Sequence, residues 1–242
     1  PVKDKLESFI LKNIDKNKLY NFLKDMEFNR LLSQAISFYG EIDLQNKNQL
    51  TKKNDNEKID VKKYECILNK KQLHNWIKKL NENSVISIDT ETSSLNPLEA
   101  DLIGVSFSYE TNQACYIPLN HQTKSELSKD IVLKSIKPIL EDKSIKKVGQ
   151  NIKFDYTILK RNGINIEPLE DTMLMSYTLD AGINRHNLDT LSEIHLNHKT
   201  ISYKDLTGSG KDKKNFSEVN LEEATKYAGE DADVTLRIYK YL

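Results

Sequence analysis

Two carboxylates stand together at the end of a short apolar segment, in the sequence Asp89-Thr90-Glu91. The preceding residues, 85–89 (VISID), predict a compact strand, and a loop is expected to follow. Side chains at positions i and i+2 of a strand point to the same side, so Asp89 and Glu91 can converge on one point. Carboxylate oxygens are the ligands that magnesium prefers, although acid pairs at strand ends also occur as plain solvated groups.

A third acid, Asp155, closes the segment 149–155 (GQNIKFD). This segment is expected to follow a short strand and to open a helix. Asn151 and Asp155 are four residues apart, which predicts that they share one helical face. An acid near a helix start is explained equally well by its favourable interaction with the helix dipole. Read alone, this segment therefore does not decide between metal binding and a structural role.

A fourth acid lies in a segment with helical spacing, where Tyr227 and Asp231 are also four residues apart. One helical face would present the phenol and the carboxylate together. The neighbouring Glu230 and Asp233 are expected to be solvated surface acids. The alternative is an amphipathic surface helix that carries several acids without a function. None of these segments is decisive alone, but their combination is far more specific.

The segments that must position these residues alternate between strand and helix patterns. Strands are expected at 64–68, 85–89, 102–109, 114–119 and 145–148, with a hairpin at 110–113. Helices are expected at 71–80, 126–141, 153–162, 171–180, 187–195 and 221–240. Pro138 is expected to kink or break the helix that contains it. Adjacent strands followed by a helix, a strand and more helices predict a mixed α/β sheet flanked by helices.

The region before residue 62 has a different composition. Residues 1–40 show helical spacing, and Asp15 is expected to be a helix N-cap. Residues 41–61 are polar and rich in lysine and asparagine, which is typical of a linker. The main domain is therefore expected at 62–242. Because the chain begins with Pro1 rather than Met and ends inside a helical pattern, we interpret it as a fragment of a longer protein.

The overall composition is compatible with a folded core. Hydrophobic residues make up 38% of the chain, and 36 basic residues balance 36 acidic ones. The zero net charge gives no support for nucleic-acid binding, and it does not exclude an acidic nuclease site. Cys66 and Cys115 form neither a disulfide framework nor a metal-ligand spacing. A reduced, cytoplasmic location is expected, because no membrane-spanning run and no signal peptide are found.

In their order, the three acidic segments resemble the pattern of the DEDDy exonuclease family: Asp-x-Glu, then Asn-x-x-Phe-Asp, then Tyr-x-x-x-Asp. Residues 62–242 are also similar to the proofreading 3′→5′ exonuclease domain of bacterial DNA polymerase I. The similarity is carried by IDTETSSL (88–95), LIGVSFSY (102–109), YIPL (116–119), KKVGQNIKFDYTIL (146–159), DTMLMSYTL (171–179), RHNLDTL (185–191), HKTISYKDLTGSGK (198–211) and LEEATKYAGEDADVTL (221–236). Residues 17–34 resemble the end of the preceding 5′-nuclease region. The resemblance implies a ribonuclease H-like mixed five-stranded sheet flanked by helices, with a helical N-terminal appendage.

The resemblance also implies a catalytic site with two divalent metal ions, Mg²⁺ or Mn²⁺. Asp89 would bridge both ions, Glu91 and Asp231 would complete the first site, and Asp155 would hold the second ion largely through water. Tyr227 would orient the attacking water through its hydroxyl. The reaction would be hydrolysis of the last phosphodiester, which releases a nucleoside 5′-monophosphate and leaves a shortened DNA 3′ end.

Other positions match the family's substrate-binding residues. Leu95 would wedge between the last two bases, with core packing as the rival explanation. Tyr203 would stack on the terminal nucleotide, at a position where the family often has Phe, and core packing is the rival explanation here too. Thr92, Gln150 and Asn151 would touch sugar or phosphate near the metal ions. Stacking on an aromatic side chain tolerates any base, which suits an enzyme that must accept any mismatch.

The implied substrate is a single-stranded or frayed DNA 3′ end, and the implied partner is the polymerase domain of the same parent chain. No membrane is implied, and the location would be nucleoid-associated. Ribonuclease D-type exoribonucleases share the same acids, so RNA is an alternative substrate. A non-catalytic spacer and a plain nucleic-acid-binding module are further alternatives; the complete acid set argues against the first and the zero net charge against the second. Arg185 and His186 could approach phosphate or be structural.

Overall fold

The structure is a computed structural model that describes residues 13–41, 58–121, 125–208 and 214–242. The chain divides into two compact units, residues 1–55 and residues 56–242. This division falls inside the polar segment that the sequence analysis interprets as a linker. The expected domain boundaries, at 40/41 and 61/62, remain predictions.

Within residues 13–41, the described part of the first unit, the chain forms the helices α1 (Lys16–Asp25) and α2 (Asn29–Tyr39). Asp15 is the N-cap of α1 as predicted, because its carboxylate accepts a hydrogen bond of 3.1 Å from a backbone N–H in the first turn. Tyr20 of α1 is fully buried, and its hydroxyl donates to the carbonyl oxygens of residues 35 and 40 at 3.1 and 2.7 Å. The apolar positions expected in a helix before residue 13 lie outside the described residues.

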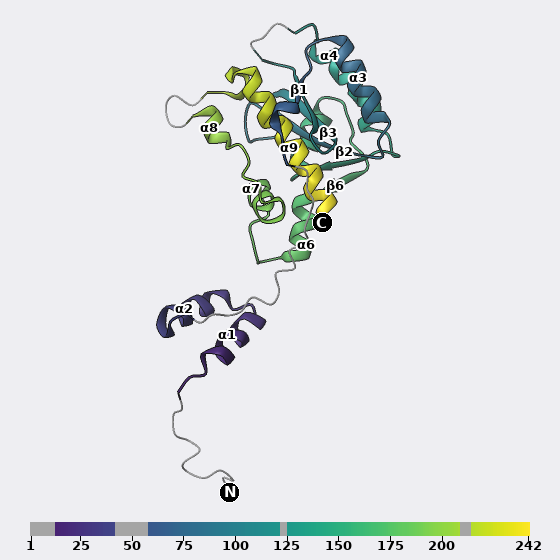
Figure 1. Cartoon of the computed structure of the whole chain (residues 1–242). Helices are drawn as coiled ribbons and strands as arrows, with labels where there is room; N and C mark the ends of the chain where they lie inside the picture. The colour runs from purple at the N-terminus through teal and green to yellow at the C-terminus, as the bar shows by residue number, and fades with distance from the viewer. Residues whose placement is uncertain (1–12, 42–57, 122–124, 209–213) are drawn as a thin grey trace. The chain divides into compact units, whose positions relative to one another are not determined.

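The second unit is built on a six-stranded mixed sheet (Figure 1). Its strands are β1 (Glu65–Cys66), β2 (Val85–Thr92), β3 (Leu102–Glu110), β4 (Gln113–Pro118), β5 (Lys146–Gly149) and β6 (Leu169–Asp171). The order across the sheet is β1-β4-β3-β2-β5-β6. Strand β3 is antiparallel to both of its neighbours, and the other pairs are parallel. The acid-bearing strand β2 therefore lies in the interior of the sheet.

The predicted α/β class with a mixed sheet is confirmed, but the expected count of five strands is wrong. Strand β6 was not expected, since its three residues show no readable alternation. It forms because it pairs in parallel with β5, where Leu169 aligns with Lys147 and Asp171 aligns with Gly149. Long-range pairing of this kind overrides local propensity. Strand β1 is also shorter than predicted, with only two residues in place of 64–68.

Helices cover both faces of the sheet (Figure 1). They are α3 (Lys70–Asn81), α4 (Lys129–Leu140), α5 (Lys153–Arg161), α6 (Thr172–Asp180), α7 (Leu188–Leu191) with a π-helical continuation (Ser192–Leu196), α8 (Tyr203–Thr207) and α9 (Leu221–Tyr241), with 3-10 turns at Val61–Lys63 and Phe216–Glu218. Helix α4 begins later than predicted because Ser128 is its N-cap. Pro138 lies inside its last turn, so the helix is not broken there. Helix α8 was not predicted.

Successive side chains of strand β2 point to opposite faces of the sheet. Ile86 and Ile88 are fully buried in the core that also contains the apolar residues of α3, α4 and α5. Ser87 points to the opposite side, where its hydroxyl donates to the carbonyl oxygen of Ala232 on α9 at 2.7 Å. Because side chains alternate along a strand, Asp89 and Glu91 face α9 as well. This arrangement brings the acids of β2 beside the acids of α9.

Helix α9 is anchored by an ionic network centred on Asp233, which is fully buried. Its carboxylate accepts hydrogen bonds from Arg237 Nε at 3.0 Å, from the Tyr64 hydroxyl at 2.8 Å and from the Asn112 backbone N–H at 3.2 Å. The helix can approach Tyr64 closely because residue 229 is glycine; a Cβ there would lie 2.8 Å from the tyrosine ring. This network fixes the axial position of α9 against the sheet.

The prediction that Glu230 and Asp233 are solvated surface acids is therefore wrong. Glu230 is also buried, with 1% of its surface exposed, and it is hydrogen-bonded to His198 and to the backbone of Ile201. Helical spacing could not reveal this burial, since α9 is covered on more than one side by segments that are distant in sequence. None of the described helices is long and apolar enough to cross a membrane.

We predict that Asp233→Ala will lower the free energy of unfolding by about 3–5 kcal/mol, because it leaves the buried guanidinium of Arg237 without this carboxylate. Lys226→Ala is the matched control on α9, where it removes a solvent-exposed pair with Glu222 and should leave the free energy of unfolding nearly unchanged. Urea denaturation followed by circular dichroism measures both changes. Equal losses in the two variants would contradict the anchoring role of Asp233.

Candidate active site

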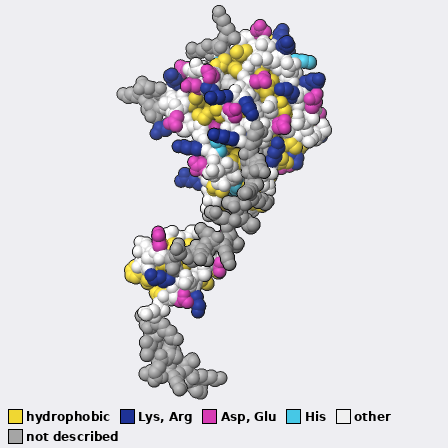
Figure 2. All heavy atoms as spheres, viewed as in Figure 1, with side chains coloured by type: hydrophobic (Ala, Val, Ile, Leu, Met, Phe, Trp, Pro, Cys, Tyr) yellow, Lys and Arg dark blue, Asp and Glu magenta, His cyan; other side chains and the backbone are white. Residues whose placement is uncertain are grey.

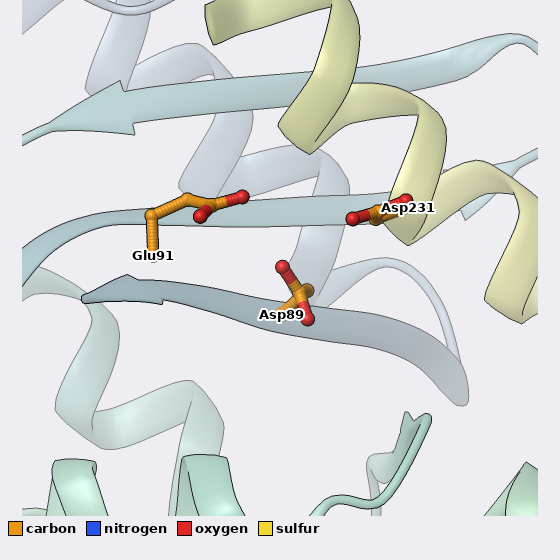
Figure 3. A group of neighbouring side chains, drawn as sticks. All are labelled: Asp89, Glu91 and Asp231. Carbon is orange, nitrogen blue, oxygen red and sulfur yellow. The ribbon is translucent and has the colours of Figure 1, made fainter. Parts of the chain in front are cut away.

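A cleft of about 660 Å³ lies where β2 meets α9. The lining residues are Asp89, Thr90, Glu91, Thr92, Ser93, Ser94, Leu95, Phe154, Tyr203, Lys214, Asn215, Tyr227 and Asp231. Figure 3 shows that Asp89 and Glu91 extend from the strand and Asp231 from the helix into a common space. One carboxylate oxygen from each residue lies within 4.8 Å of the others. The convergence of Asp89 and Glu91 that strand alternation predicts is thus present, and Asp231 joins them.

Burial raises the pKa values of these acids, and for Glu91 the neighbouring negative charges add to the shift. Burial raises the pKa of Glu91 well above its usual value, and the negative charges of Asp89, Asp231 and Asp155 raise it further. Burial also raises the pKa of Asp89 to about 6, although a hydrogen bond from the backbone of Thr90 opposes this shift. The charges that act on Glu91 are all carboxylates. Full ionisation of the cluster is therefore unfavourable unless a cation joins it.

Asp155 lies in the first turn of α5 and is 3% exposed. It is not part of the group of three; one of its carboxylate oxygens accepts hydrogen bonds from the backbone N–H and the hydroxyl of Thr90, at 2.9 and 2.6 Å. Burial and the nearby charge of Asp89 raise the pKa of Asp155. Thr90 was missed by the sequence analysis, although its place between two acids of a strand implies that it points to the other side.

Two residues expected near the metal ions do not line the cleft. Asn151 precedes α5 in a left-handed conformation (φ 57°), so the prediction that it shares a helical face with Asp155 is wrong. The reason is local: the turn between β5 and α5 requires a positive φ, which asparagine tolerates. The Gln150 side-chain amide donates to the carbonyl oxygen of His186 at 2.7 Å and accepts from the Thr172 hydroxyl at 2.5 Å.

Tyr227 lines the cleft beside Asp231. Burial raises the pKa of the phenol far above its usual value, and the charges of Asp231, Glu91 and Asp89 raise it further. The hydroxyl therefore keeps its proton at neutral pH. It can donate a hydrogen bond, but it cannot act as a strong base.

Aromatic and apolar side chains surround the acids. Tyr203 is 38% exposed in the cleft, and its ring is parallel to that of Phe216, with the centroids 6.3 Å apart. Leu95 is 93% exposed at the cleft, so the alternative that it packs in the core is wrong. The Thr92 hydroxyl, also at the cleft, donates to the carbonyl oxygen of Ser94 at 3.0 Å. The cleft thus places an exposed leucine and a tyrosine ring near the carboxylates.

Four further positions lie in the cleft or in a second hollow. Arg185 and His186 line a separate hollow beside α6, where a ring nitrogen of His186 is hydrogen-bonded to the Ser176 hydroxyl at 2.9 Å. Lys214 and Asn215 line the cleft but gave no signal in the sequence, because nothing in their local pattern distinguishes them from other polar loop residues.

Comparison with known sequences agrees with this geometry. The sequence profile of a 3′–5′ exonuclease family matches residues 64–242. The DNA polymerase I of Pseudomonas aeruginosa is 40% identical over 185 residues, which is 74% of this chain and 20% of that protein. The DNA polymerase I of Borreliella burgdorferi is 41% identical over 178 residues, which is 73% of this chain and 19% of that protein. The chain thus spans about one fifth of the length of these relatives.

Solved structures with the same fold are nucleases. Escherichia coli RNase D has a TM-score of 0.56 at 17% identity, with 73% of this chain and 43% of that chain covered. Brucella melitensis NrnC has a TM-score of 0.52 at 22% identity, with 66% and 72% covered. At these identities the likeness shows only the fold, which is the ribonuclease H-like fold expected from the sequence. The profile match and the polymerase relatives go further: the chain belongs to the 3′–5′ exonuclease family and contains a 3′–5′ exonuclease domain related to that of DNA polymerase I.

Proposed function

We propose that this domain removes nucleoside 5′-monophosphates from DNA 3′ ends with the help of two divalent metal ions, Mg²⁺ or Mn²⁺. The observation that carries the proposal is the convergence of Asp89, Glu91 and Asp231, whose carboxylate oxygens lie within 4.8 Å of one another. Such close like charges are unfavourable by themselves, and a cation would neutralise them.

The residues present suit such ions. The donor set consists of oxygen atoms alone, which Mg²⁺ and Mn²⁺ prefer. Asp89, Glu91 and Asp231 would hold the first ion. Asp155 would hold the second ion together with Asp89, whose charge is close enough to raise the pKa of Asp155. When bound, the ions would lower the pKa of the attacking water and stabilise charge on the leaving oxygen.

The side chains of the cleft would then position the reacting groups. The protonated hydroxyl of Tyr227 would donate a hydrogen bond and so orient the attacking water. Thr90 would keep the carboxylate of Asp155 in one orientation through its two hydrogen bonds. Because β2 and α9 are parts of the packed core, these groups are held before a substrate arrives, which lowers the reorganisation needed for reaction.

The apolar rim of the cleft suits an unpaired terminal nucleotide. The exposed side chain of Leu95 would separate the last two bases, and the ring of Tyr203 would stack on the terminal one. Thr92 would contact the sugar or phosphate, and Gln150 and Asn151 would do so only after the loop before α5 rearranges. Figure 2 shows basic and acidic side chains interspersed on the visible face.

We further propose that the domain proofreads for a polymerase domain in the same parent chain. The support comes from the DNA polymerase I relatives, which are about five times as long as the matched region. The substrate would be a single-stranded or frayed DNA 3′ end, and the location would be cytoplasmic and nucleoid-associated. An RNA of the same sequence is the comparison substrate in the test, since the fold is shared with RNase D.

The chain should shorten a 5′-labelled, 3′-mismatched DNA primer from its 3′ end in the presence of Mg²⁺ or Mn²⁺. Asp89→Ala and Asp155→Ala should lower the rate by orders of magnitude while the circular dichroism spectrum stays unchanged. Asp130→Ala, which removes an exposed acid from α4, is the matched control and should keep the rate. No shortening of DNA with either metal, or faster shortening of the matching RNA, would contradict the proposal.

Tyr203→Ala should raise the KM for a single-stranded DNA about five- to hundredfold, because stacking on one base contributes about 1–3 kcal/mol. Tyr203→Phe keeps the ring and should stay near the wild-type KM. Steady-state kinetics on oligodeoxynucleotides of one length measures both variants. A KM that rises as much for phenylalanine as for alanine would rule out stacking as the role of this ring.

Asp89→Asn should raise the melting temperature of the metal-free chain at pH 8. The folded-state pKa of Asp89, about 6, lies above its unfolded value, so the folded state binds the proton more tightly. The destabilisation by this carboxylate is therefore present above pH 6 and is lost as the pH falls toward about 4. Scanning calorimetry should also show that Mg²⁺ stabilises the wild type more than the variant. A wild-type advantage at pH 8 without metal would contradict this account.

A further inference from the structure

Glu230 is next to Asp231 on α9, but it does not line the cleft. Both of its carboxylate oxygens are hydrogen-bonded to groups outside the cleft. One is 2.8 Å from His198 Nε2, and the other accepts a hydrogen bond of 2.6 Å from the Ile201 backbone N–H. Its side chain is 1% exposed, whereas that of His198 is 26% exposed. Both partners lie in residues 197–202, which we call the strap.

The strap is held at two further points. The Ser192 hydroxyl donates to the carbonyl oxygen of His198 at 2.9 Å, and the Thr200 hydroxyl donates to the Asp189 carboxylate at 2.6 Å. These contacts tie it to α7 and its π-helical continuation. The strap leads directly into α8, whose first residue is Tyr203. Only one residue separates Tyr203 from Ile201, whose backbone N–H donates to Glu230. The backbone between Ile201 and Tyr203 therefore has little conformational freedom.

The ring of Tyr203 has defined neighbours. It lies parallel to the ring of Phe216, with an angle of 7° between the planes, and it meets the ring of Tyr227 edge-on at a centroid distance of 5.9 Å. Any displacement of the strap would change both contacts. It would also move the exposed part of the ring relative to the carboxylates of the cleft.

We propose that Glu230 and His198 are positioning residues for the terminal nucleotide: through the strap they hold Tyr203 at the depth where a base can stack on it. The inference rests on the proposed function, because it assumes that Tyr203 receives that base. Helix α9 would then serve two tasks from adjacent residues. Asp231 faces the reacting phosphate, and Glu230 sets the position of the stacking ring.

The test compares His198→Ala with His198→Gln. The glutamine amide nitrogen can replace Nε2 as the donor to Glu230, whereas alanine removes the contact. His198→Ala should raise the KM for a single-stranded oligodeoxynucleotide about fivefold, while kcat stays within about twofold, since the loss of one hydrogen bond to a charged group weakens positioning and leaves the acids in place. His198→Gln should restore the wild-type KM. Glu193→Gln, an exposed change on the π-helical continuation of α7 that precedes the strap, is the matched control.

A double variant shows whether the effect passes through Tyr203. His198→Ala combined with Tyr203→Ala should have the KM of Tyr203→Ala alone, because interacting sites are non-additive. Additive changes, or a KM for His198→Ala equal to that of the wild type, would overturn the proposal. Should His198→Ala fail to fold, Thr200→Val takes its place, with Thr200→Ser as the variant that keeps the hydroxyl.

A readout that needs no cleavage separates this proposal from the exonuclease assignment. An oligodeoxynucleotide with a fluorescent 3′-terminal 2-aminopurine should lose fluorescence when that base stacks on Tyr203, measured without a catalytic metal. The wild type and His198→Gln should quench it strongly, and His198→Ala should quench it less. If the wild type does not shorten DNA, the proposed function fails. If all three proteins quench the fluorescence equally, or the wild type does not quench it, the proposed role of the strap fails.

Discussion

The repulsion among four carboxylates is the constraint on which the rest of this structure depends. Asp89, Glu91 and Asp231 present oxygens within 4.8 Å of one another. Burial raises the pKa of each, and the charges of neighbouring acids raise those of Glu91 and Asp231 further. Such a cluster opposes folding unless rigid elements hold it. The interior strand β2 and the long helix α9 supply that rigidity, since β2 is paired with a strand on each side and α9 buries many of its side chains against the sheet.

The position of α9 follows from contacts outside the cleft. The Asp233–Arg237 pair lies within α9 and moves with the helix. The contacts that fix α9 along and across the sheet come from other segments: Tyr64 and the Asn112 backbone donate to Asp233, and Ser87 donates to the helix backbone. Displacing the helix would leave these buried polar groups unpaired, so the contacts resist the displacement that repulsion in the cleft would otherwise cause. The stability of the fold and the geometry of the candidate metal site are therefore coupled through one helix.

Much of this could be predicted from the sequence, for identifiable reasons. Strand alternation was enough to bring Asp89 and Glu91 together, and helical spacing was enough to pair Tyr227 with Asp231. Strand β6 and the burial of Glu230 could not be predicted, because each depends on contacts between segments that are distant in sequence. The left-handed Asn151 was missed for a local reason, since helical spacing was read through the turn between β5 and α5. Thr90 lay in the middle of the most prominent motif, yet its bond to Asp155 becomes visible only when α5 is placed beside β2.

The central claim is that the carboxylates of the cleft bind two divalent metal ions that carry out the hydrolysis. The most direct measurement is a crystal structure of the chain grown with Mn²⁺ and a nucleoside 5′-monophosphate, with anomalous diffraction recorded at the manganese edge. The account predicts one anomalous peak among Asp89, Glu91 and Asp231 and a second between Asp89 and Asp155, with the base of the nucleotide on Tyr203. Manganese bound elsewhere, or a nucleotide bound in the cleft without any metal peak, would contradict it.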